Sequence, residues 1–325
     1  MNQRVMNEPY STFSSAAFGG DGWQPRTRTH AEEIGQLWAD CRVDSEWAPL
    51  QAVLLHCPGD ELIGHADPDA AQLLDHVDLA LARAQHGAIA AAYRDAGVTV
   101  HALDPDGPVP PNQMFCADLM FMTPEGVILA RPASAVRAGE ERHIARRLTA
   151  LGVPVLRTLT GSATFEGADA LWLDPTTVLL ARGLRTNDEG CRQVADCLAG
   201  IGVEAIVCDL PFGSMHFMGL LRFADRDLAI AWPRRTPHRA VEAMRDRGMQ
   251  VAFLPQESGH SQSTGFNFVT LGPKRILMVA GHAPTQDFLE SLGIDCTAVE
   301  AGELAKAAGA IGCLSGILSR APAAG

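Results

Sequence analysis

The sequence predicts an α/β fold in which a repeated unit closes on itself as a pseudo-symmetric five-bladed α/β propeller. A helix-like segment, a glycine and an alternating apolar strand occur five times, with the glycines at positions 97, 152, 202, 248 and 293. A hairpin-like pair of apolar runs precedes four of these helices, starting at positions 118, 169, 219 and 268. Self-similarity at a nearly fixed period is typical of repeat architectures such as propellers.

Each unit is expected to run strand, strand, helix, strand. The centres of the four hairpins read TPEG, DPTT, ADRD and GPKR, which are residues that favour tight turns between antiparallel strands. Glycine suits the position just after a helix, where the chain needs a left-handed conformation. The sequence therefore predicts five ββαβ units.

The first unit is short, because only the run LQAVLLHCP at 50–58 stands where a hairpin is expected. The C-terminal run AIGCLSGIL at 310–318 is a spare strand in this interpretation, and together the two runs complete one blade and close the ring. An open α/β sheet is the alternative, although the chain has no glycine-rich phosphate loop. We expect one catalytic propeller domain over residues 41–325, preceded by an arm or lid at residues 1–40.

Composition excludes several classes of function. The 325 residues are 47% hydrophobic with a formal net charge of −12, and basic residues form no run interleaved with aromatics, so nucleic acid is not an expected partner. No apolar stretch is long enough for a membrane helix, and the N-terminus lacks a signal-peptide core. The eight cysteines form no CxxC pair, so we expect free thiols, no structural zinc and a cytoplasmic location.

The repeat alignment brings chemically active residues together. Glu166 and His216 occupy equivalent positions before the third and fourth hairpins, and equivalent positions of a closed ring meet around its axis. Asp118 at the second hairpin and Cys313 before the closing strand should reach the same region. We therefore expect a thiol, an imidazole and two carboxylates in one central cavity.

This set of side chains suits a guanidinium, a planar cation whose carbon resists attack. A thiolate is a strong enough nucleophile, and a bound cation beside a cysteine favours its charged form. Carboxylates can hold the guanidinium N–H groups while a histidine protonates the departing amine and later activates water. The expected intermediate is an amidino-thioether on Cys313.

Seven segments resemble, in order, the motifs of the guanidine-modifying enzyme superfamily, whose members have the pentein fold. They are VDSEWAPLQAVLLHCPGDEL, PNQMFCADL, ARPASAVRAGEE, TFEGADALWL, GLRTNDEG, SMHFMGLL and GAIGCLSGIL. The arginine deiminase and dimethylarginine dimethylaminohydrolase branch is the most similar, over roughly residues 43 to 320. The resemblance implies a five-bladed propeller that uses neither a metal nor a cofactor.

The same resemblance implies roles for eight residues. The catalytic group consists of the nucleophile Cys313, the acid/base His216 and its partner Glu166, which also binds the guanidinium. The residues implied to bind substrate are Asp118 at the guanidinium, Arg137 and Arg185 at the substrate carboxylate, and Asn112 and Phe115 in the pocket wall.

Three positions depart from the deiminase pattern. Met218 stands where deiminases carry an aspartate two residues after the histidine, so one guanidinium-binding carboxylate is missing. Ala117 replaces an arginine, and Gly312 replaces a histidine before the nucleophile. Because dimethylarginine dimethylaminohydrolases also lack that aspartate, a substituted guanidine is as good a candidate as arginine.

Plainer interpretations remain for several of these residues. Cys116 is the competing thiol, but it lies in the motif of Asp118, where the family does not place its nucleophile. Asp169 is better explained as a brace of the EGAD turn. For Arg185 the alternative is a role in helix capping through its neighbours Thr186 and Asn187. His260 is expected to be an exposed loop histidine.

The sequence thus predicts a hydrolase of a guanidine C–N bond. An amidinotransferase, in which an amine resolves the same intermediate, is the alternative, and a non-catalytic propeller that binds a partner is a third. The expected partner is a small guanidine such as arginine or a derivative. The sequence leaves open which guanidine is bound and whether the chain forms a homodimer.

Overall fold

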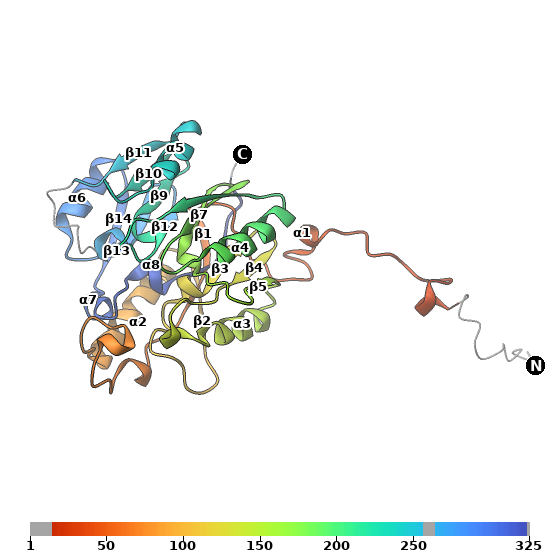
Figure 1. Ribbon diagram of the computed structural model, residues 1–325, viewed down its shortest axis with the longest axis horizontal. Helices are drawn as coiled ribbons and strands as arrows, with labels where there is room; N and C mark the ends of the chain where they lie inside the picture. Colours follow the sequence, from red (N-terminus) through yellow and green to blue (C-terminus); the bar gives the residue numbers. More distant parts are fainter. Residues whose placement is uncertain (1–14, 256–263, 324–325) are drawn as a thin grey trace, which may run out of the picture.

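The computed structural model describes residues 15–255 and 264–323, and the strands in these residues form five three-stranded sheets. In every sheet the middle strand is antiparallel to one neighbour and parallel to the other. The sheets follow one another along the chain (Figure 1), and each corresponds to one predicted ββαβ unit. The predicted five-bladed α/β architecture is confirmed.

Burial decreases from the first strand of each blade to the third. The first strands are almost wholly buried: β15 (Gly316–Arg320), β3 (Met120–Thr123), β6 (Ala170–Asp174), β9 (Leu221–Asp225) and β12 (Val269–Gly272). The middle strands are β1 (Leu50–Leu55), β4 (Gly126–Leu129), β7 (Thr177–Arg182), β10 (Leu228–Ala231) and β13 (Arg275–Val279). The third strands have exposed ends: β2 (Thr99–Ala102), β5 (Val155–Thr158), β8 (Glu204–Asp209), β11 (Gln250–Phe253) and β14 (Asp295–Val299). The first strands therefore form the inner wall of the propeller.

One helix connects the second and third strands of each blade. These helices are α2 (Leu79–Asp95), α3 (Glu140–Ala150), α4 (Asp188–Gly200), α5 (His238–Asp246) and α6 (Ala283–Ser291). The five predicted glycines all have φ between 74° and 82°, the left-handed conformation that ends a helix without a side-chain clash. The repeat glycines were therefore correctly interpreted as helix ends.

A short helix precedes the inner strand of every blade. These five turns are η5 (Cys116–Leu119), η7 (Gly167–Asp169), η8 (Phe217–Gly219), η10 (Thr264–Phe266) and α8 (Ile311–Leu314). The prediction of one strand over 310–318 is wrong in its first half, because α8 occupies that half and β15 starts at Gly316. Both pieces are buried, and an apolar run of this length does not distinguish a buried helical turn from a strand.

Pairing between the two ends of the chain closes the ring. Strand β15 pairs antiparallel with β1, with Leu50 opposite Arg320 and Val53 opposite Ile317. The parallel strand β2 then completes the first blade. The predicted completion of the first unit by the C-terminal segment is confirmed.

The N-terminal segment projects from the propeller (Figure 1), and helix α1 (His30–Glu33) lies where it reaches the body. Ile34 is buried, and the Ala39 amide donates to the Gly152 carbonyl. Residues 1–14 lie outside the described part of the chain, so the predicted lid role of the arm stays a prediction. Another short helix, α7 (Gly302–Ala305), lies before α8.

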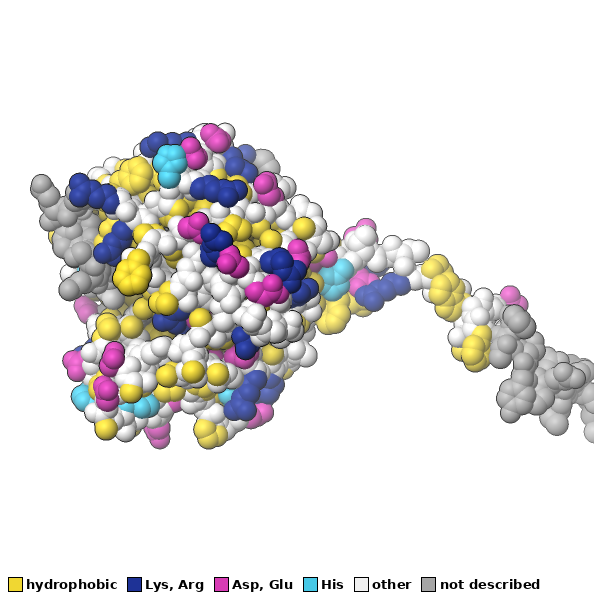
Figure 2. All heavy atoms as spheres, viewed as in Figure 1, with side chains coloured by type: hydrophobic (Ala, Val, Ile, Leu, Met, Phe, Trp, Pro, Cys, Tyr) yellow, Lys and Arg dark blue, Asp and Glu magenta, His cyan; other side chains and the backbone are white. Residues whose placement is uncertain are grey.

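The surface carries mixed charge. Basic and acidic side chains are interspersed over the face seen in Figure 2, without an extended basic stripe. Among the described residues, no helix combines the length and apolar character needed to span a bilayer.

Gly167 offers a test of how closely the blades pack at the axis. A Cβ at this position would overlap the backbone oxygens of Ala117 and Met120 in the neighbouring blade. We expect Gly167→Ala to lower the free energy of unfolding by about 1–3 kcal/mol, as overpacking typically does. Gly200→Ala in α4 is the control, because a Cβ there meets nothing and alanine favours the helix. Urea unfolding measures both, and equal stabilities would contradict the close approach.

Candidate active site

One polar side chain from each blade lies close to a short helix at the propeller axis. The five residues are Asp118 in η5, Glu166 before η7, His216 before η8, Asn267 after η10 and Cys313 in α8. They follow one another by 48, 50, 51 and 46 positions. The sequence predicted four of them and missed Asn267, although the repeat period pointed to it.

Two pockets meet at His216 and Cys313, which line both. The first encloses about 680 Å³ and contains Asp118, Arg137 and Arg185, so we call it the carboxylate pocket. The second encloses about 970 Å³ and contains Asn267, Trp232 and Arg235, so we call it the tryptophan pocket. The thiol of Cys313 and the imidazole of His216 therefore lie where two neighbouring pockets meet.

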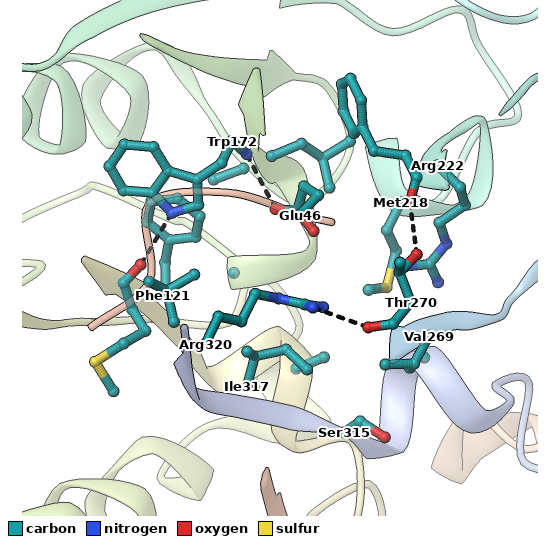
Figure 3. Close-up of a pocket in the computed structure, with 18 of the residues that line it drawn as sticks. Glu46, Phe121, Trp172, Met218, Arg222, Val269, Thr270, Ser315, Ile317 and Arg320 are labelled. Atoms are coloured by element: carbon teal, nitrogen blue, oxygen red, sulfur yellow. Dashed lines mark hydrogen bonds between the residues drawn. The ribbon is translucent and has the colours of Figure 1, made fainter. Parts of the chain in front are cut away.

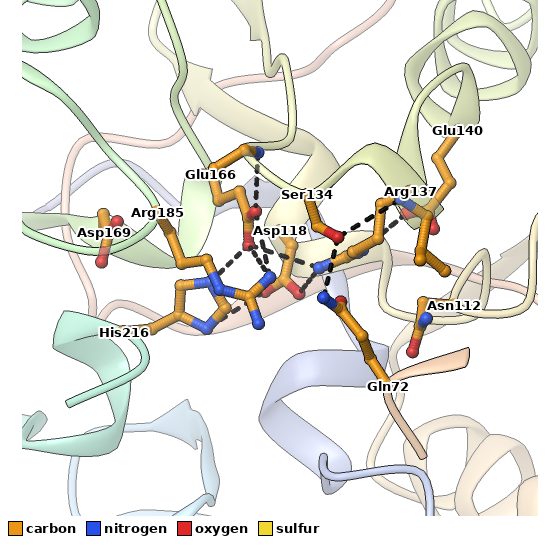
Figure 4. A network of polar contacts seen from close by, with 12 residues as sticks. Gln72, Asn112, Asp118, Ser134, Arg137, Glu140, Glu166, Asp169, Arg185 and His216 are labelled. Atoms are coloured by element: carbon orange, nitrogen blue, oxygen red, sulfur yellow. Dashed lines mark hydrogen bonds and ion pairs between the residues drawn. The ribbon is translucent and has the colours of Figure 1, made fainter. Parts of the chain in front are cut away.

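His216 and Glu166 form a short hydrogen bond at the base of the carboxylate pocket (Figure 4). His216 Nε2 lies 2.6 Å from Glu166 Oε2, and His216 Nδ1 lies 3.9 Å from Asp118 Oδ1. Burial by itself lowers the pKa of His216, but the charge of Asp118 and the bond to Glu166 outweigh it and raise the pKa to about 9. The imidazole is therefore protonated at neutral pH.

Glu166 has the complementary shift. Burial by itself raises its pKa, but the hydrogen bond and charge of His216, with smaller effects of Arg137 and Arg185, lower the pKa to about 2. The pair is thus an imidazolium and a carboxylate. His216 Nδ1 has no hydrogen bond to the described residues, so it is the ring nitrogen free to exchange a proton with a ligand.

Arg137 lies among three carboxylates. Its Nη1 is 2.7 Å from Asp118 and 3.3 Å from Glu166, while Nε and Nη2 donate to Glu140 at 3.0 and 2.8 Å. Burial by itself would lower the pKa of Arg137, but the three carboxylates raise it above its ordinary value. Four of its five N–H groups are engaged, so little of Arg137 is left for a substrate carboxylate.

Arg185 is the more available arginine. Its Nη1 lies 3.3 Å from Glu166 Oε1, and its side chain is 12% exposed against 3% for Arg137. The expected capping residues also take their places: Asn187 caps α4, and the Thr186 hydroxyl donates to Asp169. Arg185 is thus positioned by a capped turn and still faces the carboxylate pocket.

Cys313 is 7% exposed, and the Asn267 amide donates to its sulfur at 2.9 Å. Burial and the charge of Asp118 raise the pKa of the thiol, although a backbone hydrogen bond at Ala310, the Asn267 amide and Arg222 act in the opposite direction. Cys116 is fully buried, belongs to a different apolar cluster and lines neither pocket. Of these two thiols, only Cys313 faces the pockets.

The predicted wall residues Asn112 and Phe115 contact neighbouring parts of the chain. Asn112 donates to the Ala71 carbonyl at 2.9 Å, and Phe115 lies 5.9 Å from the guanidinium of Arg137. Asp169 accepts from Thr186 at 2.7 Å and from the Phe217 amide at 3.0 Å. Asp169 therefore has a structural role, but it connects two blades instead of bracing the EGAD turn as expected. His260 lies outside the described residues.

Three of these side chains are also close enough together to hold a metal ion. One oxygen or nitrogen atom from each of Asp118, Glu166 and His216 lies within 4.8 Å of the other two. The Arg137 guanidinium contacts both carboxylates, and His216 is bonded to Glu166. This donor set already surrounds a planar organic cation. Its chemistry fits a guanidinium better than a metal ion.

The sequence is similar to a known family over its central part. Residues 70–209 match the model of eukaryotic N,N dimethylarginine dimethylhydrolases. A dimethylarginine dimethylaminohydrolase of Streptomyces coelicolor is 26% identical over 74% of this chain and 87% of its own. The corresponding enzyme of Pseudomonas aeruginosa is 24% identical over 73% and 89%.

Solved structures of related enzymes share the fold. A dimethylarginine dimethylaminohydrolase adduct superposes with a TM-score of 0.68 over 82% of this chain and 99% of the other, at 23% identity. An inosamine-phosphate amidinotransferase of Streptomyces griseus gives 0.67 over 88% and 99%, at 15% identity. The chain has the pentein fold.

Two departures from the deiminase motifs have a structural counterpart in this pentein. Met218 is buried and lines the tryptophan pocket, so that side of the site offers a thioether instead of a carboxylate. A Cβ on Gly312 would clash with the guanidinium of Arg222 and the amide oxygen of Asn267. A side chain at this position would therefore displace Arg222 and Asn267 from their present places.

The His216–Glu166 pair gives a pH-dependent test. We expect Glu166→Gln to lower the pKa of His216 from about 9 by roughly one to three units, because the nearest negative charge is removed. NMR titration of the imidazole, assigned with His216→Gln, measures this shift. Glu290→Gln on exposed α6 is the control, and a pKa that moves equally in both variants would contradict the assignment.

Stability should follow the same pair. Because the folded pKa of His216 lies above its unfolded value of about 6.5, its contribution is complete below that pH and is lost as the pH rises through about 9. In Glu166→Gln this loss should occur at lower pH.

Proposed function

We propose that this pentein is a hydrolase that cleaves a C–N bond of arginine or a substituted guanidine through a covalent intermediate on Cys313. The observation that carries the proposal is the meeting of Cys313, His216 and Asp118 at one pocket, with the buried Glu166 bonded to His216. The similarity to dimethylarginine dimethylaminohydrolases supports the same class of reaction.

An unpartnered oxygen supports a guanidinium as the ligand. Asp118 Oδ1 is buried and accepts no hydrogen bond, although such atoms almost always have a partner. It faces His216 beside the space that Cys313 lines. A guanidinium N–H would satisfy this oxygen and hold the guanidinium carbon near the sulfur.

In the first half-reaction the Cys313 thiolate attacks the guanidinium carbon. A bound cation lowers the pKa of the neighbouring thiol and so helps to form the thiolate. The C–N bond to the departing amine then breaks, and the protonated His216 donates its Nδ1 proton to that nitrogen. The products of this step are a neutral amine and an amidino-thioether on Cys313.

In the second half-reaction the neutral His216 accepts a proton from water while the water oxygen attacks the amidino carbon. The C–S bond breaks, which returns Cys313 to the thiolate and releases the ureido product with one extra proton, and that proton passes through solvent to the departed amine. Glu166 stabilises the imidazolium that exists before the first step and again after the second. The residues return to their starting charges at the end of the cycle.

A substrate panel tests the proposal. We expect turnover of at least one compound among arginine, its methylated forms, agmatine and other guanidines, with mass spectrometry detecting an adduct on Cys313. Cys313→Ser should reduce the rate by at least a thousandfold, because a hydroxyl is a much weaker nucleophile for this carbon. Full activity of Cys313→Ser would overturn the mechanism, and Cys116→Ser is the control that should retain activity.

The tryptophan pocket favours amidino transfer as the second candidate. Arg235 follows His216 by 19 positions, the same spacing that separates Asp118 from Arg137 and Glu166 from Arg185. It is exposed, lies 5.2 Å from the Trp232 ring and has no ion pair to the described residues. An acceptor amine bearing a carboxylate could bind there and replace water in the second half-reaction.

Product analysis separates the two candidates. If the protein is a transferase, turnover should need an added amino acid or amine, and the amidino group should appear on it. Arg235→Gln should then raise the KM for the acceptor several-fold while the first half-reaction is unchanged. For a hydrolase, we expect release of one ureido product without an acceptor, and ¹⁸O from labelled water in that product.

A further inference from the structure

A third pocket, which we call the rear chamber, borders Gly312, the residue before Cys313, and most of its lining is apolar. Its polar lining includes Arg222, Arg320 and Glu46 (Figure 3). Arg320 donates to the carbonyl oxygens of Ala48 and Thr270, which fixes its guanidinium to the surrounding backbone. Arg222 has no such backbone partner among the described residues.

Arg222 is a buried cation without an ion pair in the described residues. Its side chain extends from the inner strand β9 and is 7% exposed, and its Nε has no hydrogen bond. Burial lowers the pKa of its guanidinium, and the largest effect in the opposite direction comes from Cys313. Burying a charge without a partner is unfavourable, so a compensating negative charge is expected nearby.

Asn267 connects Arg222 to the sulfur. Arg222 Nη2 donates to Asn267 Oδ1 at 3.1 Å, and Asn267 Nδ2 donates to Cys313 Sγ at 2.9 Å. Because a guanidinium has donors only, it fixes the amide with its oxygen toward Arg222 and its NH₂ toward the sulfur. The arrangement presents an oriented N–H, polarised by a cation, to the reacting atom.

The backbone is shaped around this connection. The Gly312 amide donates to the Asn267 carbonyl at 3.1 Å, which joins α8 to the turn after η10. A side chain at Gly312 would occupy the space of the Arg222 guanidinium and the Asn267 amide oxygen. The residue next to the nucleophile is therefore compatible with this pair only if it has no Cβ.

We propose that Arg222, acting through Asn267, is a positioning residue that stabilises the thiolate of Cys313 before any substrate binds. The inference rests on the proposed role of Cys313 as the nucleophile. The thiol proton is lost to solvent through the pocket, and the sulfur then carries the negative charge that Arg222 lacks. Arg222 and Asn267 thus stabilise the Cys313 thiolate in the absence of substrate. A bound guanidinium in the carboxylate pocket would add to this stabilisation.

Four charged groups affect the stability of the Cys313 thiolate. Asp118 faces Cys313 from η5 and opposes the thiolate, whereas the protonated His216 faces the same pockets from the turn before η8. Arg222 favours the thiolate from β9, and Glu46 in the rear chamber partly offsets Arg222. The net effect leaves the thiol pKa raised, so removal of Arg222 should raise it further.

The test measures the pKa of Cys313 without substrate. The rate of its alkylation by iodoacetamide is followed against pH by peptide mass spectrometry, with the exposed Cys57 in the same sample as an internal reference. We expect Arg222→Met to raise the pKa of Cys313 by about one unit or more, the usual effect of losing a nearby opposite charge. Arg222→Lys should restore part of the shift. Arg245→Gln, which removes an exposed charge from α5, should not alter it.

If Arg222→Met disturbs the fold, a variant of Asn267 can test the connection between Arg222 and Cys313 instead. Asn267→Asp keeps the size of the side chain. A carboxylate beside the sulfur should raise the pKa of Cys313 more than Asn267→Leu does. An unchanged pKa in Arg222→Met, or in both Asn267 variants, would overturn the proposal. If Arg222→Lys shifts the pKa of Cys313 as far as Arg222→Met does, the role of Arg222 is purely structural. This result would also overturn the proposal.

The outcome is independent of the proposed function. If no guanidine is turned over but the pKa of Cys313 depends on Arg222 and Asn267 as expected, the hydrolase proposal fails and this inference stands. If guanidines are turned over through Cys313 but its pKa is indifferent to Arg222, this inference fails and the hydrolase proposal stands.

Discussion

The antiparallel pairing of β15 with β1 is the contact on which the rest of the site depends. It joins segments from the two ends of the chain and completes the first blade, which leaves no gap between the first and fifth units. Closure also places α8, and with it Cys313, next to residues from the other four blades. Because a propeller without this blade would have two free edges, ring stability and assembly of the site are the same event.

Burial then determines the charges at the axis. The carboxylates and cations of the carboxylate pocket are nearly all inaccessible to water, so their mutual interactions are strong and unpaired charges are costly. The result is an imidazolium paired with Glu166 and an arginine surrounded by three carboxylates. The carboxylates of such a site can therefore exchange a contact with an arginine side chain for a contact with another organic cation, without a large change in net charge.

Cys313, the proposed nucleophile, lines the carboxylate pocket and the tryptophan pocket, and the preceding residue, Gly312, lines the rear chamber. The first offers carboxylates for a guanidinium, the second offers Arg235 and Trp232, and the third contains Arg222. The proposed mechanism needs these different surroundings. One holds the departing group, one admits the nucleophile that resolves the intermediate, and one contains the charge that lowers the pKa of the thiol. The identity of the molecule that enters the tryptophan pocket distinguishes hydrolysis from transfer.

The sequence by itself determined the five repeated units, the glycines that end their helices and the blade completed by the two ends of the chain. These follow from local patterns, namely apolar periodicity, turn residues and a regular spacing, which the chain carries wherever it folds. The same period predicted that Asp118, Glu166, His216 and Cys313 would meet, and it could have indicated Asn267. Only the tertiary structure decided that residues 311–314 form a short helix, that Arg137 is engaged by carboxylates and that Arg222 bonds to Asn267 beside Cys313. Those outcomes depend on distances between side chains of different blades, which no pattern along one segment contains.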